Sequence, residues 1–537
     1  MPRAPTLARR DRPRAPRLAG MLLAVFAAGV PSLLAAQAVP DDLLTRAERT
    51  EYRETTRYEE VMDLLRRIDA LSDRVHLTTF GYTNEGRSLP LAVVGAPAAT
   101  PEAVLGTGKT RVYLQGNIHG AEVEGKEALL MLLRRWATGP EPPWADDLVL
   151  LVAPIYNADG NERVGLRNRP RQHGPVGGMG TRANAQGLDL NRDHMKLDSP
   201  EARSLVGLLN DYDPHVVVDL HTTDGTHHAY HLTYASPMHP NTAPAIDAFL
   251  RDRWLPEVTE RVRRTDGWEL YYYGNTSAAQ PGWYTFDHRP RYNNNYVGLR
   301  NRMAILSEAY AYLTFEERVR VTTRFVEEIL DFAQSNAAEI QRIVAEADEE
   351  PVIGRVLATR AGFQRSAEEV TILMGEVDEV RNPFTGETML LRRDVATPVR
   401  MYEYGTFAPT DTEVAPRAYY LLPEAEEAIE RLEAHGLALE PLADARAMRM
   451  ERFRVDSASV AGREYEGRRE RTVWGAWVAS TETLPAGTVR VSMDQPLARL
   501  AFTLLEPRSD DGLVAWSILD PEVRRGTLSV LREPAGS

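Results

Sequence analysis

An α/β protein with a smaller β-rich C-terminal part is the fold class that this sequence of 537 residues predicts. From about residue 40 to residue 345, short apolar runs rich in β-branched residues alternate with segments whose apolar residues recur at helical spacing. This alternation is typical of helices layered on a sheet. From residue 352 to residue 537 the apolar runs are short and strand-like, and Gly, Pro and Asp separate them. The chain therefore divides into two predicted parts, and its length suggests two or three domains at roughly 100–200 residues per domain.

The first part, residues 40–345, begins with a helix. The stretch "YEEVMDLLRRIDAL" (58–71) has its apolar residues three and four positions apart, as on one face of a helix. The runs "DDLVLLVAP" (146–154) and "PHVVVDLH" (214–221) are almost continuously apolar, as in strands that are buried on both faces. Further strands are predicted at 89–95 and 111–116, and further helices around 124–136, 200–210, 242–264 and 315–345.

The second part follows the charged stretch "AEADEEP" (345–351), which we interpret as a domain boundary. One helix is predicted within "PEAEEAIERLEAHG", between Pro423 and Gly436. No motif with recognisable chemistry occurs in this part, so we expect residues 352–537 to form a β-rich domain of unknown role. Its predicted strands lie at 371–377, 472–480, 487–493 and 513–519.

The negative net charge and the absence of cysteine argue against several kinds of function. The formal net charge of -14 argues against nucleic acid and anionic membrane surfaces as main partners. The chain has no cysteine, which excludes disulfides, thiolate metal sites and cysteine nucleophiles. A metal site in this protein must therefore use histidine and carboxylate ligands.

The N-terminal segment has the parts of a secretory signal. Residues 1–20 carry six arginines and one aspartate, and the apolar run "MLLAVFAAGVPSLLAAQA" (21–38) follows, ending in Ala36-Gln37-Ala38. A charged segment, an apolar segment and small residues at the cleavage site define such signals. An uncleaved anchor is the alternative, although Gly29 and Pro31 interrupt the run. We expect removal of residues 1–38, a mature net charge of about -19, export to the periplasm or the medium, and no stable insertion in the membrane afterwards.

A histidine and a carboxylate follow the predicted strand at 111–116, in "GNIHGAEVEGKEALL" (116–130). His119 and Glu122 are three residues apart at the start of a helical stretch, so their side chains lie on one side of the turn. They could be two solvated polar residues, or two ligands of a metal ion. A zinc site needs a third protein ligand, and His221 is the candidate because it ends another buried strand. Rival histidines follow in a polar loop: His227, His228, His231 and His239.

Two further segments place polar residues beside turns or strand ends. The stretch "NAQGLDLNRD" (184–193) contains Asp189, Asn191 and Arg192, and "MAILSEAYAY" (303–312) contains Glu308 at the end of an apolar run. Each of these side chains alone could be solvated or ion-paired. A functional role for them depends on whether they lie near His119 and His221 in the folded protein.

The order of these motifs resembles the M14 family of zinc carboxypeptidases. The resemblance covers roughly residues 50–335, and an opening strand pair in "FGYTNEGRSLPLAVVG" (80–95) fits it as well. It implies a three-layer α/β/α fold around a mixed sheet. The motifs, in the order of that family, are His119-x-x-Glu122, "NADG" (157–160), "RANAQGLDLNRD" (182–193), "DLHT" (219–222) and "LSEAY" (306–310).

By this resemblance, His119, Glu122 and His221 hold one Zn²⁺ ion, and Glu308 is the general base and acid. The ligand chemistry agrees, because two neutral imidazoles and one carboxylate leave the ion with a net positive charge. Asp189 matches the family position that hydrogen-bonds a zinc-binding histidine.

The same resemblance implies a pocket for the free carboxylate of a peptide. Asn191 and Arg192 match the pair that holds the substrate terminus, since a guanidinium binds a carboxylate with two parallel hydrogen bonds. Arg182 matches the arginine that stabilises the developing oxyanion, with Arg167, Arg169 and Arg171 as open alternatives. The family's tyrosine would fall near Phe286, where none occurs, so Tyr292 is chosen among three neighbours, with Tyr284 and Tyr296 as the others.

The resulting hypothesis is a zinc-dependent metallocarboxypeptidase with peptide substrates. One alternative is a zinc amidohydrolase or deacylase that acts on cell-wall peptides or acyl-amino acids with the same machinery. Another is a non-catalytic peptide- or glycan-binding protein, which would be expected to lack a ligand or the base. A third assigns the function to the β-rich part. The preferred side chain and the oligomeric state stay unknown at this stage.

Overall fold

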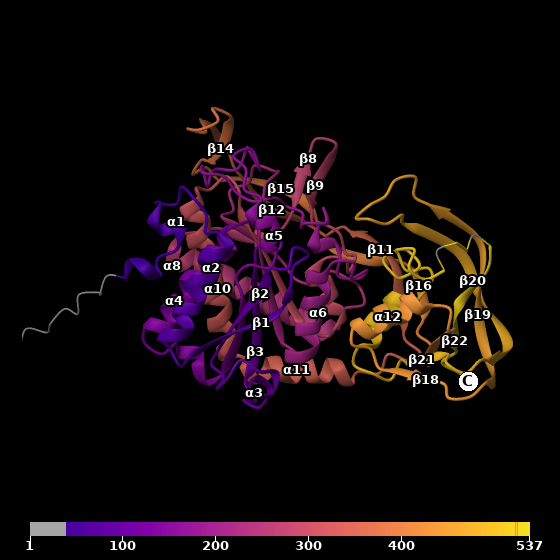
Figure 1. Cartoon of the computed structure of the whole chain (residues 1–537). Coiled ribbons are helices and arrows are strands. Elements are labelled where there is room, and N and C mark those ends of the chain that lie inside the picture. The colour runs from indigo at the N-terminus through magenta and orange to yellow at the C-terminus, as the bar shows by residue number, and fades with distance from the viewer. Residues whose placement is uncertain (1–38, 521, 524, 537) are drawn as a thin grey trace, which may run out of the picture. The chain divides into compact units, whose positions relative to one another are not determined.

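The computed structural model describes residues 39–520, 522–523 and 525–536 (Figure 1). The predicted signal, residues 1–38, lies outside this range. Among the helices of the described residues, none is long and apolar enough to cross a membrane.

An eight-stranded mixed sheet is the centre of the N-terminal part, in the order β1-β2-β4-β3-β5-β10-β6-β7. Strands β4, β3, β5 and β10 run parallel, whereas β1 and β2 pair antiparallel with their neighbours. Strand β6 pairs antiparallel with β10 and parallel with β7. Both central strands predicted as continuously apolar are buried along their whole length. The bounds are β1 Val75–Tyr82, β2 Ser88–Val94, β3 Thr110–Gly116, β4 Leu148–Ala153, β5 Val216–Thr223, β6 Leu232–Ala235, β7 Leu270–Tyr272 and β10 Met303–Tyr310.

Helices cover both faces of this sheet. Side chains along each central strand point alternately to the two faces, so each strand contributes to two hydrophobic cores. In β3, Val112 and Leu114 belong to one core and Tyr113 to the other. The first core contains residues of α2 (Tyr58–Leu71), α4 (Glu124–Thr138), α8 (Leu255–Asp266), α10 (Phe315–Ser335) and α11 (Ala337–Glu349). The second contains residues of α3 (Pro101–Leu105), α6 (Pro200–Tyr212) and α9 (Asn293–Leu299). The predicted three-layer α/β/α architecture with a mixed sheet is confirmed.

Two predicted helices are interrupted. The segment predicted as a helix at 242–264 consists of α7 (Pro244–Ala248), a π-helical turn (Phe249–Trp254) and α8. The segment at 315–345 breaks at Asn336, whose amide caps the end of α10. Short elements complete this part: the 3₁₀ turns Asp41–Leu43, Pro143–Asp146 and Leu190–Arg192, the helices α1 Arg46–Arg49 and α5 Ala158–Glu162, and the strands β8 Asn275–Ser277 and β9 Gln280–Tyr284.

The C-terminal region, residues 352–537, is rich in strands as predicted (Figure 1). Its largest sheet has the order β18-β21-β17-β22-β19-β20, and β15 pairs with β9 of the N-terminal part. The bounds are β11 Val356–Gln364, β12 Glu369–Met374, β13 Val377–Arg381, β14 Thr388–Arg392, β15 Thr397–Tyr404, β16 Thr406–Val414, β17 Ala418–Leu421, β18 Leu439–Pro441, β19 Arg446–Val460, β20 Arg471–Leu484, β21 Val489–Ser492 and β22 Gly526–Glu533, with helices α12 Glu426–Ala434 and α13 Ala498–Leu505.

One predicted strand in this region is wrong. Residues 513–519 form a series of buried turns, in which Trp516 donates to the Gly512 carbonyl and Leu513 donates to the Leu504 carbonyl. The preceding helix α13 was not predicted, and all eight of its residues are buried. A short apolar run has no polar face from which helix, strand and turn can be told apart.

The second core of the sheet continues into the C-terminal region. Tyr419, Phe453, Phe502 and Trp516 are buried in the same hydrophobic cluster as residues of α6 and β3. Residues 41–537 form one compact unit. The C-terminal region is therefore packed against the layer that carries α6 and the segment preceding it.

Candidate metal centre

The ends of three neighbouring parallel strands bring the predicted site together. His119 lies three residues beyond the end of β3, His221 lies in β5, and Glu308 lies in β10. Strand β5 pairs with β3 on one side and with β10 on the other, and His221 is directly opposite Glu308. Because the carboxyl ends of parallel strands meet at one edge, their polar side chains converge there.

His119, Glu122 and His221 point their ligand atoms at one another. The Nδ1 atom of His119 lies 2.9 Å from Glu122 Oε1, and Nδ1 of His221 lies 3.1 Å from Glu122 Oε2. The two Nδ1 atoms are 3.3 Å apart. Each of the three residues is only 2% exposed. Within the described residues, this is the set of His, Asp and Glu side chains whose geometry can hold a metal ion, and the rival histidines do not belong to it.

Both histidines have their other ring nitrogen hydrogen-bonded to a carboxylate. Nε2 of His119 lies 3.0 Å from Asp189 Oδ1, and Nε2 of His221 lies 2.9 Å from Asp219 Oδ2. These carboxylates accept the Nε2 protons, so the lone pair of each Nδ1 faces the other. Two lone pairs at 3.3 Å, with a buried carboxylate beside them, repel one another unless a proton or a metal cation lies between them. The donor set therefore fits one zinc ion with two imidazole ligands and one carboxylate ligand.

The charge distribution favours a cation at this point. Burial lowers the pKa of His221, but the charge of Asp219 and hydrogen bonds to Asp219 and Glu122 outweigh it, so the pKa is raised well above the ordinary value. Burial opposes ionisation of Glu122 as well, yet the charges of His119 and Arg169 hold the pKa of Glu122 well below its usual range. The pocket thus stabilises an ionised carboxylate next to positive charge.

Glu308 differs from Glu122 in its surroundings. Its side chain is half-buried, and among the described residues its Oε2 atom has no hydrogen-bond partner. Burial raises the pKa of Glu308 to about 8; the Glu122 carboxylate adds to the rise, while the charge of His221 lowers it. A carboxyl group that titrates near neutral pH can both accept and donate a proton.

Two arginines reach the metal centre. Arg169 pairs with Glu122 and donates to the Thr222 carbonyl at 3.1 Å. Arg182 donates to Asp189 at 2.9 Å, and its Nη1 lies 3.3 Å from His119 Nδ1. The other two open alternatives are exposed: Arg167 pairs with Glu387, and Arg171 lies at the surface. Arg169 and Arg182 are therefore the arginines that can act on a group bound here.

Asn191, Arg192 and Tyr292 lie together beyond Asp189. The guanidinium of Arg192 stacks on the ring of Tyr292 at 3.8 Å, and Nη1 of Arg192 lies 3.8 Å from Asp189 Oδ2. Asn191 Oδ1 accepts a hydrogen bond of 2.8 Å from the Asn293 amide. The predicted residues of the carboxylate pocket thus form one continuous group with the partner of His119.

The candidate tyrosines differ in their contacts. Tyr296 is fully buried and bonds to His435, and Tyr284 stacks on Tyr404. Tyr273 was not singled out from the sequence, although its hydroxyl accepts a hydrogen bond from Asn275 and its ring lies 5.3 Å from Phe286. Burial raises the pKa of Tyr273 to about 12, and the nearby charge of Glu308 adds to the rise. Tyr273, near Glu308, and Tyr292, stacked on Arg192, are thus both connected to the proposed site, and the run of three tyrosines in "LYYYGN" (270–275) was the available signal for Tyr273.

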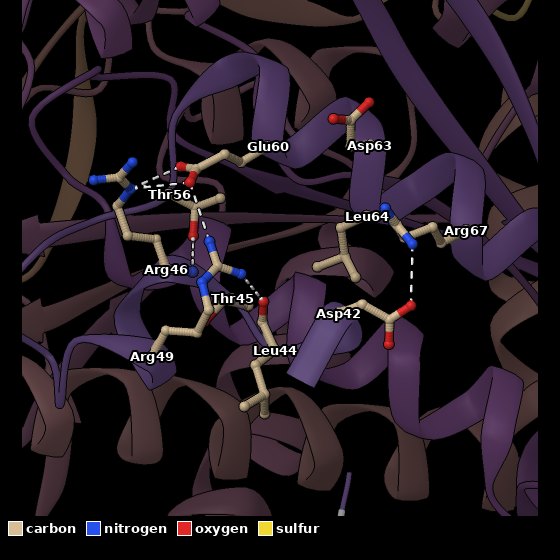
Figure 2. Close-up of a pocket in the computed structure, with 10 residues that line it drawn as sticks. All are labelled: Asp42, Leu44, Thr45, Arg46, Arg49, Thr56, Glu60, Asp63, Leu64 and Arg67. Atoms are coloured by element: carbon tan, nitrogen blue, oxygen red, sulfur yellow. Dashed lines mark hydrogen bonds and ion pairs between the residues drawn. The ribbon is translucent and has the colours of Figure 1, made fainter. Parts of the chain in front are cut away.

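A cavity near the start of the described chain is separate from this centre. Figure 2 shows its charged side chains paired with one another: Arg46 and Arg49 with Glu60, and Arg67 with Asp42. None of the ten residues that line it belongs to the metal centre. Asp63, which also lines the cavity, pairs with Arg66 outside the lining, and we assign the cavity no role.

Comparison with known proteins agrees with the geometry. Residues 59–287 match the family described as zinc carboxypeptidase, peptidase M14, a range that contains His119, Glu122, Asp189 and His221. Carboxypeptidase 2 of Trichophyton tonsurans is 25% identical over 461 residues, which cover 81% of this chain and 79% of that protein. The inactive metallocarboxypeptidase ECM14 of Saccharomyces cerevisiae is 31% identical over 138 residues, or 23% of this chain and 30% of that protein. Carboxypeptidase A of Helicoverpa armigera has a TM-score of 0.40 at 14% identity, covering 53% of this chain and 75% of that chain.

Proposed function

The chain carries a zinc carboxypeptidase domain of the M14 family, and on that premise we propose that it removes C-terminal residues from peptides. The observation that carries the proposal is the convergence of His119, Glu122 and His221 beside an unpartnered Glu308. We assign this activity to residues 40–345. When bound, zinc supplies Lewis acidity, which activates water and polarises the scissile carbonyl.

Glu308 is the proposed base and acid. It is not among the three ligands, and its place opposite His221 in the next strand puts it beside the reacting groups. It takes a proton from the attacking water and returns that proton to the leaving amine nitrogen, so the carboxyl ends each cycle as it began. Asp189 and Asp219 keep the two histidines in the tautomer and orientation that binding requires.

Arg182 is the proposed stabiliser of the negative charge that develops on the scissile carbonyl oxygen, and Arg169 is placed to assist it. Both guanidinium groups lie at the ligand cluster, Arg182 beside His119 and Arg169 beside Glu122. Fixed positive charges at the reacting centre favour the transition state over the neutral substrate.

The terminal carboxylate of the peptide is the proposed ligand of Asn191 and Arg192, with Tyr292 alongside. The ring of Tyr292 supports the planar face of the Arg192 guanidinium, which leaves the edge of the fork for a carboxylate. Binding of a free terminus by these residues would favour a carboxypeptidase over an amidohydrolase or deacylase, which would not require one.

We expect C-terminal amidation of a peptide to lower kcat/KM by about 10²-fold or more, because the amide removes the charge that Arg192 binds and leaves the half-buried guanidinium without its substrate partner. The measurement is release of amino acids from matched peptides that differ only at the terminal carboxyl group. Equal cleavage of the two peptides at the same bond would instead favour the amidohydrolase.

We also propose that the enzyme is exported and that processing removes residues 1–38. Expression of the full chain in a host with a secretory pathway should then yield a mature protein that begins at Val39. N-terminal sequencing of the exported protein gives the answer, and an intact Met1 on the active enzyme would contradict this proposal.

A further inference from the structure

The tip of the β19–β20 hairpin in the C-terminal region touches the predicted carboxylate pocket. Glu466, between the two strands, accepts a hydrogen bond of 2.7 Å from the backbone amide of Asp189. These residues are 277 positions apart in the sequence. Asp189 is also the partner of His119 and the residue that begins the turn Leu190–Arg192. One side chain of the C-terminal region is thus hydrogen-bonded to the residue that begins the turn carrying Asn191 and Arg192.

The turn that carries Glu466 has an unusual residue at its first central position. Tyr465 and Arg468 exchange two backbone hydrogen bonds of 2.8 and 3.0 Å, so Glu466 and Gly467 form a two-residue hairpin loop. Their φ angles are +48° and +79°. Such loops favour Asn, Asp or Gly at both positions, because a larger side chain is strained at positive φ. The requirements of the turn do not explain a glutamate here, whereas its bond to Asp189 does.

Charged hydrogen bonds and ion pairs hold the hairpin tip in place. Arg468 donates two hydrogen bonds of 2.7 Å to Asp198, which lies just beyond the carboxylate pocket in sequence. Buried Arg291, the neighbour of Tyr292, pairs with Glu470 of the hairpin at 2.7 Å and with Asp511 at 2.8 Å. The tip is therefore anchored on both sides of the pocket, and the position of Glu466 is fixed.

The charges around Glu466 are those of the pocket. Burial raises the pKa of Glu466 above its ordinary value, the charge of Asp189 adds to the rise, and the hydrogen bond from the Asp189 amide together with the charges of Lys196 and Arg192 opposes it. A carboxylate at this point faces the same arginine that is assigned to the substrate terminus. Glu466 is instead hydrogen-bonded to the backbone amide of Asp189, and the Arg192 guanidinium stacks on the ring of Tyr292.

We propose that Glu466 is a positioning residue for substrate binding: the C-terminal region completes the active site by holding Asp189–Arg192 in the conformation that accepts the peptide carboxylate. This inference rests on the proposed carboxypeptidase function. Without the acceptor, the Asp189 amide loses its partner, and the turn that places Asn191 and Arg192 loses one of its supports. The match to carboxypeptidase 2 covers 81% of the chain, more than residues 1–345 can supply, so that relative shares part of the C-terminal region as well.

The test uses the full chain with Glu466→Gly and Glu466→Gln. Glycine adopts positive φ freely, so Glu466→Gly should fold with an unchanged or higher Tm while KM for a free-carboxylate peptide rises about tenfold and kcat changes less than about threefold. Glutamine keeps an acceptor oxygen and should restore most of the affinity. The matched control is Glu464→Ala, since Glu464 is exposed on the same loop and forms a weak ion pair of 4.0 Å with Arg469.

A second measurement is independent of turnover. The dissociation constant of the same peptide is determined for Glu308→Gln alone and combined with Glu466→Gly, and a tenfold weakening is expected. An unchanged KM and dissociation constant in the glycine variant would overturn the proposal, as would an equal loss in the glutamine variant. If the unaltered enzyme releases no terminal amino acid, the proposed function fails, while the comparison of peptide affinities still tests Glu466.

Discussion

Replacing Glu308 with glutamine is expected to lower kcat by about 10³-fold, within the range of 10²- to 10⁴-fold that general acid–base catalysis contributes. Glutamine has nearly the shape of glutamate but accepts no proton at neutral pH. Oε2 of Glu308 has no hydrogen-bond partner among the described residues, so the substitution removes the proton-transfer group without breaking a hydrogen bond of that atom. The measurement is steady-state hydrolysis of a free-carboxylate peptide.

The control for this variant is Glu316→Gln, the same change at an exposed position of α10. Zinc content and Tm of Glu308→Gln should equal those of the unaltered enzyme, because Glu308 is not one of the ligands. Turnover at more than a tenth of the normal rate would show that another group moves the proton. Loss of zinc would show that Glu308 is a ligand instead.

Removal of the metal is expected to abolish activity, and one equivalent of Zn²⁺ per chain should restore it. The same treatment should lower Tm, because a ligand that binds only the folded state stabilises it by mass action and because the facing Nδ1 atoms lose the cation between them. His221→Ala should reproduce both effects permanently. The measurements are metal analysis, hydrolysis and thermal unfolding on the same samples.

The variant Asp219→Asn distinguishes loss of the metal ligand His221 from loss of the carboxylate that orients it. Asp219→Asn still receives a hydrogen bond from His221 Nε2, but it loses the charge that orients and polarises the ring. We expect zinc affinity to fall by about 10- to 100-fold, with activity restored at high zinc concentration. Activity in His221→Ala equal to that of Asp219→Asn would mean that His221 does not bind the metal.

Position at strand ends made His119, His221 and Glu308 candidates from the sequence, and the family resemblance supplied the ligand set, including Glu122. His119, His221 and Glu308 each follow or end a buried strand, and the strands proved to be the neighbours β3, β5 and β10. Asp219 could have been found in the same way, since residues two apart in a strand share a face and Asp219 is two positions before His221. The assignment of catalytic roles to these residues stays a prediction.

Long-range contacts account for what the sequence did not reveal. The sequence around Glu466 contains no motif that marks it as functional. Its proposed role rests on a hydrogen bond to Asp189, which lies in another part of the chain. Arg169 was only one of several candidate arginines until its contact with Glu122 was known. The wrong strand at 513–519 and the missed helix α13 have a related cause: both segments are buried on every side, so neither has the polar face that periodicity needs.

The account depends on one ion bound by three side chains, and zinc-edge anomalous diffraction from crystals of the full enzyme tests this most directly. We predict one peak per chain, bounded by Nδ1 of His119, the carboxylate of Glu122 and Nδ1 of His221. A peak at any other group of residues, or its persistence in crystals of His221→Ala, would contradict the account.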